Sequence, residues 1–311
     1  MKIVVLKFGG TSVGTIKKIK RVAEIIVGYK KKNYKVIVVS SAMSGATNEL
    51  IKKSFEISDN FSDSEHDVLV SSGEQVSCSL IAGRLIHRGY KSRSWLSWQV
   101  PLLTVGAHKN SRINLINKNK IIKYLKEGGI PIVTGFQGIN SQNRITTIGR
   151  GGSDATAIML AKFFKAERCI IYTDVEGVFT TDPNKLKKAK KIRVISYEEM
   201  LEMASLGAKV MQPVSIQDAR LNRIDIEVKS SFIKTDLYKA IAKNYQYLHW
   251  EKFFDPMQPN AFHLATKSKH RKRWPNEYSL TPFYYLNFLL EKNPTTIYDL
   301  GCGDNSFKKY I

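Results

Sequence analysis

The sequence predicts an α/β protein, a three-layer αβα sandwich around an open and mainly parallel sheet. Across residues 1–230, short β-branched runs alternate with stretches that carry apolar residues at helical spacing. The runs are apolar on both flanks, as expected of strands that helices cover on two faces. Glycine-rich turns follow several of the runs, and ligands bind at such strand ends in sheets of this kind.

Five runs are expected to form strands and six stretches to form helices. The strand candidates are residues 3–8, 35–40, 130–136, 169–174 and 224–232. The helix candidates are residues 15–32, 73–88, 114–127, 153–165, 196–205 and 210–222. In the first helix candidate Ile19 and Ile26 share one apolar stripe, and Thr15 is placed to cap the start.

The composition is that of a globular chain. The 311 residues are 43% hydrophobic and 10% aromatic. No apolar run approaches the roughly 20 residues of a membrane span, and residues 1–10 read as a first strand and not as a signal peptide. Cys78, Cys169 and Cys302 show neither zinc-ligand spacing nor a disulfide pattern. We therefore expect a cytoplasmic protein without a membrane anchor or a protein-bound metal.

The net charge of +22 is spread along the chain and comes mainly from lysine. Spread lysines usually form solvated helix faces, although a basic field also attracts polyanions, ATP included. The densest basic run, residues 267–274, has Trp274 beside it, so a nucleic-acid contact and a solvated linker are both open. The linker is favoured, and no nucleic-acid partner is expected.

Two turns near the amino terminus carry residues suited to polar ligands. In KFGGTS (7–12), two glycines after a strand let backbone N–H groups approach phosphate oxygens, and Lys7 adds positive charge. The alternative is an ordinary tight turn with a surface lysine. The second turn, SSAMSGATN (40–48), offers hydroxyl groups that would either bind a small polar ligand or cap the next helix.

Two later turns carry charged groups as well as hydroxyls. In TTIGRGGSD (146–154), Arg150 suits bidentate capture of a carboxylate, and Asp154 suits an ammonium group or a metal–nucleotide. Capping of the next helix by Ser153 or Asp154 is compatible with either role. YTDVEGVFTTDP (172–183) offers hydroxyls and carboxylates to a nucleotide. The chain contains neither GxxxxGK[ST] nor GxGxxG, which counts against a P-loop or Rossmann dehydrogenase site.

Seven motifs occur in order along residues 1–232. They are KFGGTSV (7–13), SSAMSGATNEL (40–50), SSGEQVS (71–77), GFQG (135–138), TTIGRGGSDATA (146–157), YTDVEGVFTTDP (172–183) and MASLGAKVMQP (203–213). Together they resemble the catalytic domain of aspartate kinases, in the amino acid kinase superfamily. The resemblance implies the amino acid kinase fold. It also implies phosphorylation of L-aspartate to 4-phospho-L-aspartate by ATP with Mg²⁺ carried on the nucleotide, the first step toward lysine, threonine and methionine.

The resemblance also implies roles for individual residues. Lys7 would stabilise the transferring phosphoryl group, helped by N–H groups around Gly9 and Gly10, and Asp154 would hold Lys7 in place. Arg150 would pair with the substrate α-carboxylate and Glu74 with its ammonium. The implied aspartate pocket consists of Ser41, Thr47, Glu74, Phe136, Arg150 and Ser153. The implied ATP site consists of Lys7, Gly9, Gly10, Thr11, Thr173, Asp174, Phe179 and Lys209.

Three points stay open or depart from the pattern. For Glu74 the alternative is a carboxylate at a helix start, where the helix dipole favours it. Phe179 stands where the family often has tyrosine, and Asn184 where arginine is common. Losing a hydroxyl and a guanidinium would weaken ATP binding, while the phosphoryl-transfer set of Lys7, Arg150 and Asp154 is intact. An active enzyme is therefore expected.

Residues 233–311 are expected to form a separate tail. Aspartate kinases usually continue here into two small regulatory ACT domains, but the tail has no βαββαβ-like pattern, so feedback inhibition of the usual type is not expected. Residues 276–311, ending in a strand and Gly301-Cys302-Gly303, resemble the truncated start of a class I S-adenosylmethionine-dependent methyltransferase. One strand cannot close a cofactor pocket, so methyl transfer is not expected either.

Two other functions remain as alternatives. One is a superfamily relative that phosphorylates another carboxylate, such as glutamate or an acetylated amino acid. The other is a non-catalytic protein of kinase fold that binds nucleic acid through its basic tail. The expected partners are L-aspartate and ATP, and a homo-oligomer is open.

Overall fold

The computed structural model describes residues 1–232, apart from 183–185 and 209. The described strands are β1 (Ile3–Phe8), β2 (Lys35–Ser40), β3 (Ser92–Trp95), β4 (Leu102–Val105), β5 (Arg112–Ile116), β6 (Ile130–Thr134), β7 (Gln137–Ile139), β8 (Ile145–Thr147), β9 (Arg168–Thr173), β10 (Val178–Phe179), β11 (Lys191–Ile192) and β12 (Ile226–Ser230). The described helices are α1 (Gly10–Val13), α2 (Ile16–Lys31), α3 (Ala46–Ile57), α4 (Asp63–His87), α5 (Asn119–Lys126), α6 (Gly152–Phe163), α7 (Tyr197–Ser205) and α8 (Pro213–Asn222).

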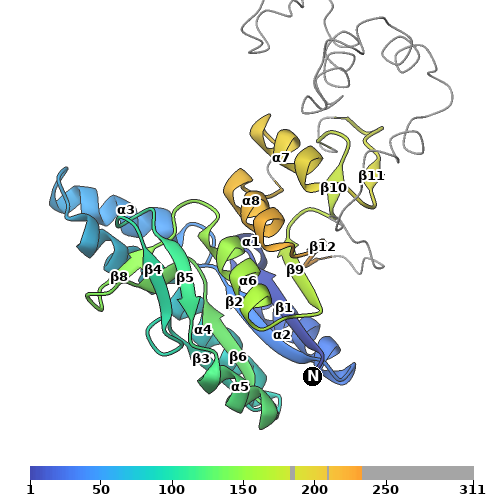
Figure 1. Ribbon diagram of the computed structural model, residues 1–311, viewed down its shortest axis with the longest axis horizontal. Coiled ribbons are helices and arrows are strands. Elements are labelled where there is room, and N and C mark those ends of the chain that lie inside the picture. The colour runs from blue at the N-terminus through green and yellow to red at the C-terminus, as the bar shows by residue number, and fades with distance from the viewer. Residues whose placement is uncertain (183–185, 209, 233–311) are drawn as a thin grey trace, which may run out of the picture. The chain divides into compact units, whose positions relative to one another are not determined.

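The main sheet has six strands in the order β12-β9-β1-β2-β6-β3, and every neighbouring pair is parallel (Figure 1). Helices cover both of its faces. Leu6 of β1 packs with Ile26 of α2 and Ile81 of α4 on one face, while Val5 packs with Ile158 of α6 on the other. The predicted αβα sandwich is therefore confirmed, and the alternation along β1 places Lys7 on the same side as α6.

Five strands of the main sheet were predicted, although β6 and β12 are shorter than predicted and the edge strand β3 was missed. Residues 3–8 and 35–40 are strands with the predicted bounds, and Thr15 caps α2 by accepting a 3.3 Å hydrogen bond from the Lys18 N–H. Two helix predictions were wrong in part. Helix α4 begins at Asp63 and not at residue 73, and residues 114–116 belong to β5, with α5 starting only at Asn119.

A smaller sheet of four strands, in the order β5-β4-β7-β8, was not predicted. Its β4 and β7 are parallel, and its other two pairs are antiparallel. A side chain at Gly138 would not fit, because its Cβ would lie 2.3 Å from Thr104 Cγ2 and 2.8 Å from the Leu102 carbonyl oxygen. Nearby, the hydroxyls of Thr104 and Thr146 lie 2.6 Å apart across the sheet. Backbone therefore packs closely at the centre of this sheet.

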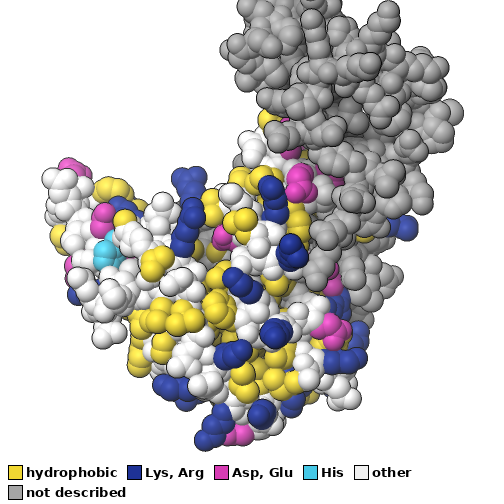
Figure 2. Space-filling view, in the orientation of Figure 1, with side chains coloured by type: hydrophobic (Ala, Val, Ile, Leu, Met, Phe, Trp, Pro, Cys, Tyr) yellow, Lys and Arg dark blue, Asp and Glu magenta, His cyan; other side chains and the backbone are white. Residues whose placement is uncertain are grey.

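Charge is dispersed over the face of the molecule that Figure 2 displays. Lysine and arginine side chains lie scattered there among apolar and uncharged ones. This fits the interpretation of the basic excess as a solvated surface. No described helix has the length and apolar character that a membrane crossing requires. The predicted tail, with the basic run 267–274 and the methyltransferase-like segment, lies outside the described residues.

Candidate active site

Lys7 is a buried ammonium group near the end of β1. The residue is only 8% exposed, and its Nζ lies 2.6 Å from Asp154 Oδ1, in the first turn of α6. The alternative of a surface lysine is therefore wrong. A buried charge is costly unless it is paired, so the Asp154 carboxylate offsets the desolvation of Lys7. The predicted contact between these two residues is present in the structure.

The glycine turn after β1 lies directly beside this ion pair. Gly9 donates a 3.1 Å hydrogen bond to the Tyr172 carbonyl of β9, and a Cβ on Gly9 would lie 3.4 Å from Lys7 Nζ. A Cβ on Gly10 would lie 2.9 Å from the Ala42 carbonyl oxygen. Thr11 follows in α1 and is half-buried. The absence of side chains at Gly9 and Gly10 keeps the backbone of this turn close to the Lys7 ammonium and to the turn after β2.

We expect a Gly10→Ala substitution to lower the free energy of unfolding by about 1–3 kcal/mol, because the added methyl group would press on the Ala42 carbonyl. Gly28→Ala is the matched control, since Gly28 lies inside α2 with nothing within 4 Å of its Cβ position. That control should stabilise the protein by roughly 0.5–1 kcal/mol. Urea unfolding measures both, and equal effects of the two substitutions would contradict the close approach.

Glu74 is a buried carboxylate in the middle of α4, so the alternative of a helix-start residue is wrong. Its Oε1 accepts a 3.0 Å hydrogen bond from the Ala42 N–H, whereas its Oε2 is buried and has no hydrogen-bond partner among the described residues. Burial raises the pKa of this carboxyl to about 8, although the Ala42 N–H partly opposes the shift. A cationic ligand would satisfy the unpaired oxygen.

The turn after β2 is tied to α4 and to β1. Ser41 donates its N–H to the Phe8 carbonyl (3.0 Å), and the Ser77 hydroxyl donates to the Ser41 carbonyl (2.7 Å). Ser77 was given no role by the sequence analysis, although it lies three residues after Glu74 and therefore on the same side of the helix. Thr47, in the first turn of α3, is half-buried, and no hydrogen bond joins it to the other predicted residues described here.

Phe136, between β6 and β7, lies against the start of α6, where a Cβ on Gly152 would lie 2.9 Å from the Phe136 ring and where Ser153 follows. Phe136 adopts a left-handed backbone (φ +66°), which is uncommon for a residue with a side chain, and its N–H donates to Thr156 Oγ1 at 3.2 Å. A Cβ on Gly135 would lie 2.6 Å from Ser153 Oγ. Neither Ser153 nor Asp154 caps α6, because the N-cap position is Gly151 and no side chain caps it.

Arg150 lies in the loop between β8 and α6. Its neighbours Gly149 and Gly151 both have φ +77°, a conformation that glycine adopts without strain. Arg150 itself is exposed and forms no ion pair with the described residues. The structure therefore places this guanidinium on the loop that precedes Asp154, but no contact joins it to the Lys7–Asp154 pair.

The residues predicted for the nucleotide side are only partly brought together. Thr173 ends β9, and its hydroxyl donates to Asp174 Oδ1 at 3.1 Å, while Asp174 is exposed. Phe179 is half-buried in β10. Lys209 and Asn184 lie outside the described residues. Among the residues that the structure does describe, no group of three or more histidine, cysteine or acidic side chains is arranged to hold a metal ion.

A link that the sequence analysis missed joins Thr173 to the glycine turn. The Ser231 N–H and hydroxyl both donate to the Thr173 carbonyl, at 3.0 and 3.2 Å, and the same hydroxyl lies 2.9 Å from Ser12 Oγ of α1. Ser231 directly follows β12, which pairs with β9 in the sheet. The only sequence signal was the short SSF run (230–232) at the end of the last predicted strand, where the structure ends β12 at Ser230.

The chain is similar to known aspartate kinases in both sequence and structure. The aspartokinase of Geobacillus stearothermophilus is 49% identical over 231 residues, which are 74% of this chain and 57% of that protein. The aspartate kinase of Synechocystis superposes with a TM-score of 0.69 at 37% identity, covering 78% of this chain and 40% of that one. Aspartokinase III of E. coli, in complex with aspartate and ADP, superposes with a TM-score of 0.69 at 28% identity. The match covers 79% of this chain and 66% of that one.

The chain therefore spans little more than half the length of the curated relative from Geobacillus. The family model "Amino acid kinase family" matches residues 2–230, nearly the whole of the described part. Together with the parallel sheet and the glycine turn beside a buried lysine, this match shows that the chain belongs to the amino acid kinase family.

Proposed function

We propose that the chain transfers the γ-phosphoryl group of ATP to the side-chain carboxylate of L-aspartate and so forms 4-phospho-L-aspartate. The observation that carries the proposal is the buried Lys7–Asp154 pair beside the glycine turn. It supplies a fixed positive charge next to backbone N–H groups, which is what a transferring phosphoryl group needs. The names of the aspartokinase relatives, and the aspartate and ADP bound to the E. coli enzyme, support this choice of substrates.

The proposed reaction needs positioning and charge neutralisation more than proton transfer. The aspartate carboxylate is already an anion, so its oxygen attacks the γ-phosphorus without a general base. The bond from the γ-phosphorus to the bridging oxygen breaks, and ADP leaves with the electron pair. Lys7 would stabilise the charge on the equatorial oxygens, with help from N–H groups of the glycine turn other than that of Gly9, which donates to the Tyr172 carbonyl, and Asp154 would orient Lys7. Mg²⁺ would arrive on the nucleotide phosphates as part of the substrate.

The amino-acid side of the proposed site uses two charges of opposite sign. Glu74 Oε2, buried and unpaired among the described residues, would accept the α-ammonium group. The exposed Arg150 would pair with the α-carboxylate. Ser41, Thr47, Phe136 and Ser153 would line the space between them, and Thr11, Thr173, Asp174, Phe179 and Lys209 would contact the nucleotide. We place this reaction in the cytoplasm, where ATP is available.

The division of the chain is also part of the proposal. We propose a catalytic domain of residues 1–232 followed by a tail of residues 233–311 that does not consist of ACT domains. The end of the family match at residue 230 supports the position of this boundary.

A coupled assay tests the proposed function. With Mg·ATP and L-aspartate, we expect turnover that hydroxylamine traps as aspartyl hydroxamate. Glutamate and an N-acetylated amino acid serve as competing acceptors in the same assay. If either compound is turned over faster than L-aspartate, that compound and not L-aspartate is the acceptor of the reaction. Folded protein that turns over none of them would instead indicate a non-catalytic protein of kinase fold.

A further inference from the structure

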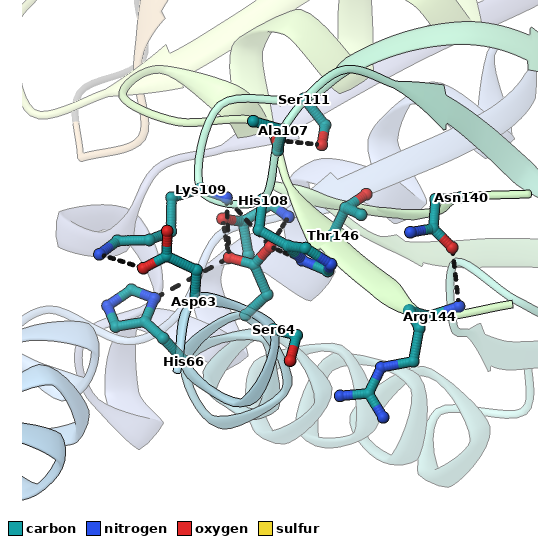
Figure 3. A network of polar contacts seen from close by, with 12 residues as sticks. Asp63, Ser64, His66, Ala107, His108, Lys109, Ser111, Asn140, Arg144 and Thr146 are labelled. Carbon is teal, nitrogen blue, oxygen red and sulfur yellow. Dashed lines mark hydrogen bonds and ion pairs between the residues drawn. The ribbon is translucent and has the colours of Figure 1, made fainter. Parts of the chain in front are cut away.

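Asp67, four residues into α4, is a fully buried carboxylate outside the set of residues considered so far. Four hydrogen-bond partners surround it. Its oxygens accept from the Lys109 N–H (3.0 Å), the Thr147 N–H (3.1 Å) and the Thr147 hydroxyl (2.6 Å), and Oδ2 lies 2.7 Å from His108 Nδ1. Figure 3 shows His108 and Lys109 reaching from the loop between β4 and β5 toward the start of α4. One carboxylate thus joins three separate segments.

Thr147, one of these partners, is the last residue before the loop that carries Arg150. It ends β8, and its own carbonyl accepts a 2.9 Å hydrogen bond from the Ser111 N–H. Every polar group of Thr147 is therefore held. Two residues later, a Cβ on Gly149 would lie 3.2 Å from the Lys109 carbonyl oxygen, so the loop also rests on the segment that Asp67 holds. At its far end the loop is held by Ser215, whose hydroxyl donates to the Gly151 carbonyl at 3.2 Å, so the Thr147 anchor fixes the end of the loop that precedes Arg150.

Helix α4 joins this anchor to the ammonium site. Asp67 and Glu74 are seven residues apart, about two helical turns or roughly 10 Å, and both are buried on the same side. Glu74 is fixed at one end by the Ala42 N–H, and Asp67 fixes the Arg150 loop at the other. The rigid helix therefore sets the separation between a carboxylate that would hold an ammonium and a guanidinium that would hold a carboxylate.

We propose that Asp67 is a positioning residue that sets the spacing between the ammonium and α-carboxylate contacts of the amino-acid substrate. The proposal rests on the proposed function, because it needs an α-amino acid as the ligand of Glu74 and Arg150. Asp67 acts through Thr147 and touches neither substrate. Lys7 lies on β1, and Asp154 is held in the first turn of α6, whose start is also fixed by the hydrogen bond from Ser215 to the Gly151 carbonyl, so phosphoryl transfer should depend less on this spacing than amino-acid binding does.

The test is steady-state kinetics of the full-length Asp67→Asn variant. Asparagine keeps the shape but replaces one acceptor oxygen by an N–H₂ group facing N–H donors. We expect the KM for L-aspartate to rise about tenfold, since misplaced binding groups lose affinity steeply. The KM for ATP and kcat should stay within about threefold of wild type. Thr147→Val, which removes only the hydroxyl, should shift the aspartate KM in the same direction, and Thr147→Ser should restore wild-type behaviour.

A destabilised control separates positioning from folding. Leu125→Ala creates a cavity in α5, away from Asp67 and its partners, and lowers stability without touching the loop. The positioning role is contradicted if Asp67→Asn raises the KM for L-aspartate and the KM for ATP by the same factor. It is also contradicted if the kinetic constants of Asp67→Asn equal those of Leu125→Ala. Turnover of L-aspartate by the wild type is measured first. If folded wild-type protein shows no turnover, the proposed function is wrong. If the wild type turns over L-aspartate and Asp67→Asn has an unchanged KM for L-aspartate, only the positioning role is wrong.

Discussion

Replacing Lys7 by methionine is expected to lower kcat for phosphoryl transfer by about a thousandfold, the loss typical of removing a charge that stabilises a transferring phosphoryl group. Methionine keeps the length and the apolar stem of lysine but has no ammonium group. The hydroxamate assay measures the effect at saturating ATP and L-aspartate. Retention of a tenth or more of the wild-type kcat would show that the buried ammonium does not act on the reacting phosphate.

The same substitution will also destabilise the protein, and this effect needs its own control. Without Lys7, the Asp154 carboxylate is left buried and unpaired, which costs about 3–5 kcal/mol. The double variant Lys7→Met with Asp154→Asn removes both charges, so urea unfolding should show most of the stability recovered. Activity should stay as low as in the single variant. Recovery of activity together with stability would mean that the ion pair serves the fold alone.

Glu74→Gln is expected to lower kcat/KM for L-aspartate roughly a hundredfold, because the substrate ammonium favours the ionised form of the buried Glu74 carboxyl and glutamine cannot ionise. The KM for ATP should change little, since Glu74 contacts the turn after β2 and not the glycine turn. Ser77→Ala is a suitable comparison, because it removes a neighbouring hydroxyl on the same helix without changing charge. An equal loss in both variants would argue against recognition of an ammonium by Glu74.

The raised pKa of Glu74 also predicts how stability depends on pH. The carboxyl has an ordinary pKa of 4.5 in the unfolded chain and about 8 in the folded protein. Between these values the folded state binds more protons than the unfolded state, so the free energy of unfolding falls as pH rises. The slope from this group is roughly 1.4 kcal/mol per pH unit. Urea unfolding of wild type and Glu74→Gln at several pH values from about 5 to 8 should show this slope only in the wild type.

Five of the six strands of the large parallel sheet could be predicted from sequence, because its inner strands are covered on both faces, whereas the edge strand β3 was missed. Val4, Val5 and Leu6 are each fully buried, so β1 reads as an unbroken apolar run with clear ends. The four-stranded sheet gives no such signal. Its β7 and β8 have three residues each and carry glycine, threonine and glutamine, and β5 exposes Leu115. Strands this short depend on their neighbours more than on local sequence.

The site residues that lie in or next to the glycine-rich turns could be predicted from sequence. Those that lie within a helix, away from such turns, were harder to predict. Lys7 and Asp154 were paired by family resemblance, and the structure brings them into contact. Asp67 could not be found in this way, because the predicted helix began at residue 73 and left Asp67 outside every predicted element, whereas α4 begins at Asp63. Its role depends on Lys109 and Thr147, and only the folded sheet brings those distant residues to it.

The hydroxyl of Ser231 has a consequence for any protein engineered from this chain. It is the last link between β12 and the turn that would hold phosphate, and the next residue, Phe232, lies 4.8 Å beneath the Lys18 ammonium of α2. A shortened version that ends before Ser231 would lose the contacts of this residue with Ser12 and Thr173, while Gly9 would still donate to the Tyr172 carbonyl of β9. A partner domain fused after Phe232 would start two residues after Ser231, so strain in its linker would act first on the contacts of Ser231 with Thr173 and Ser12.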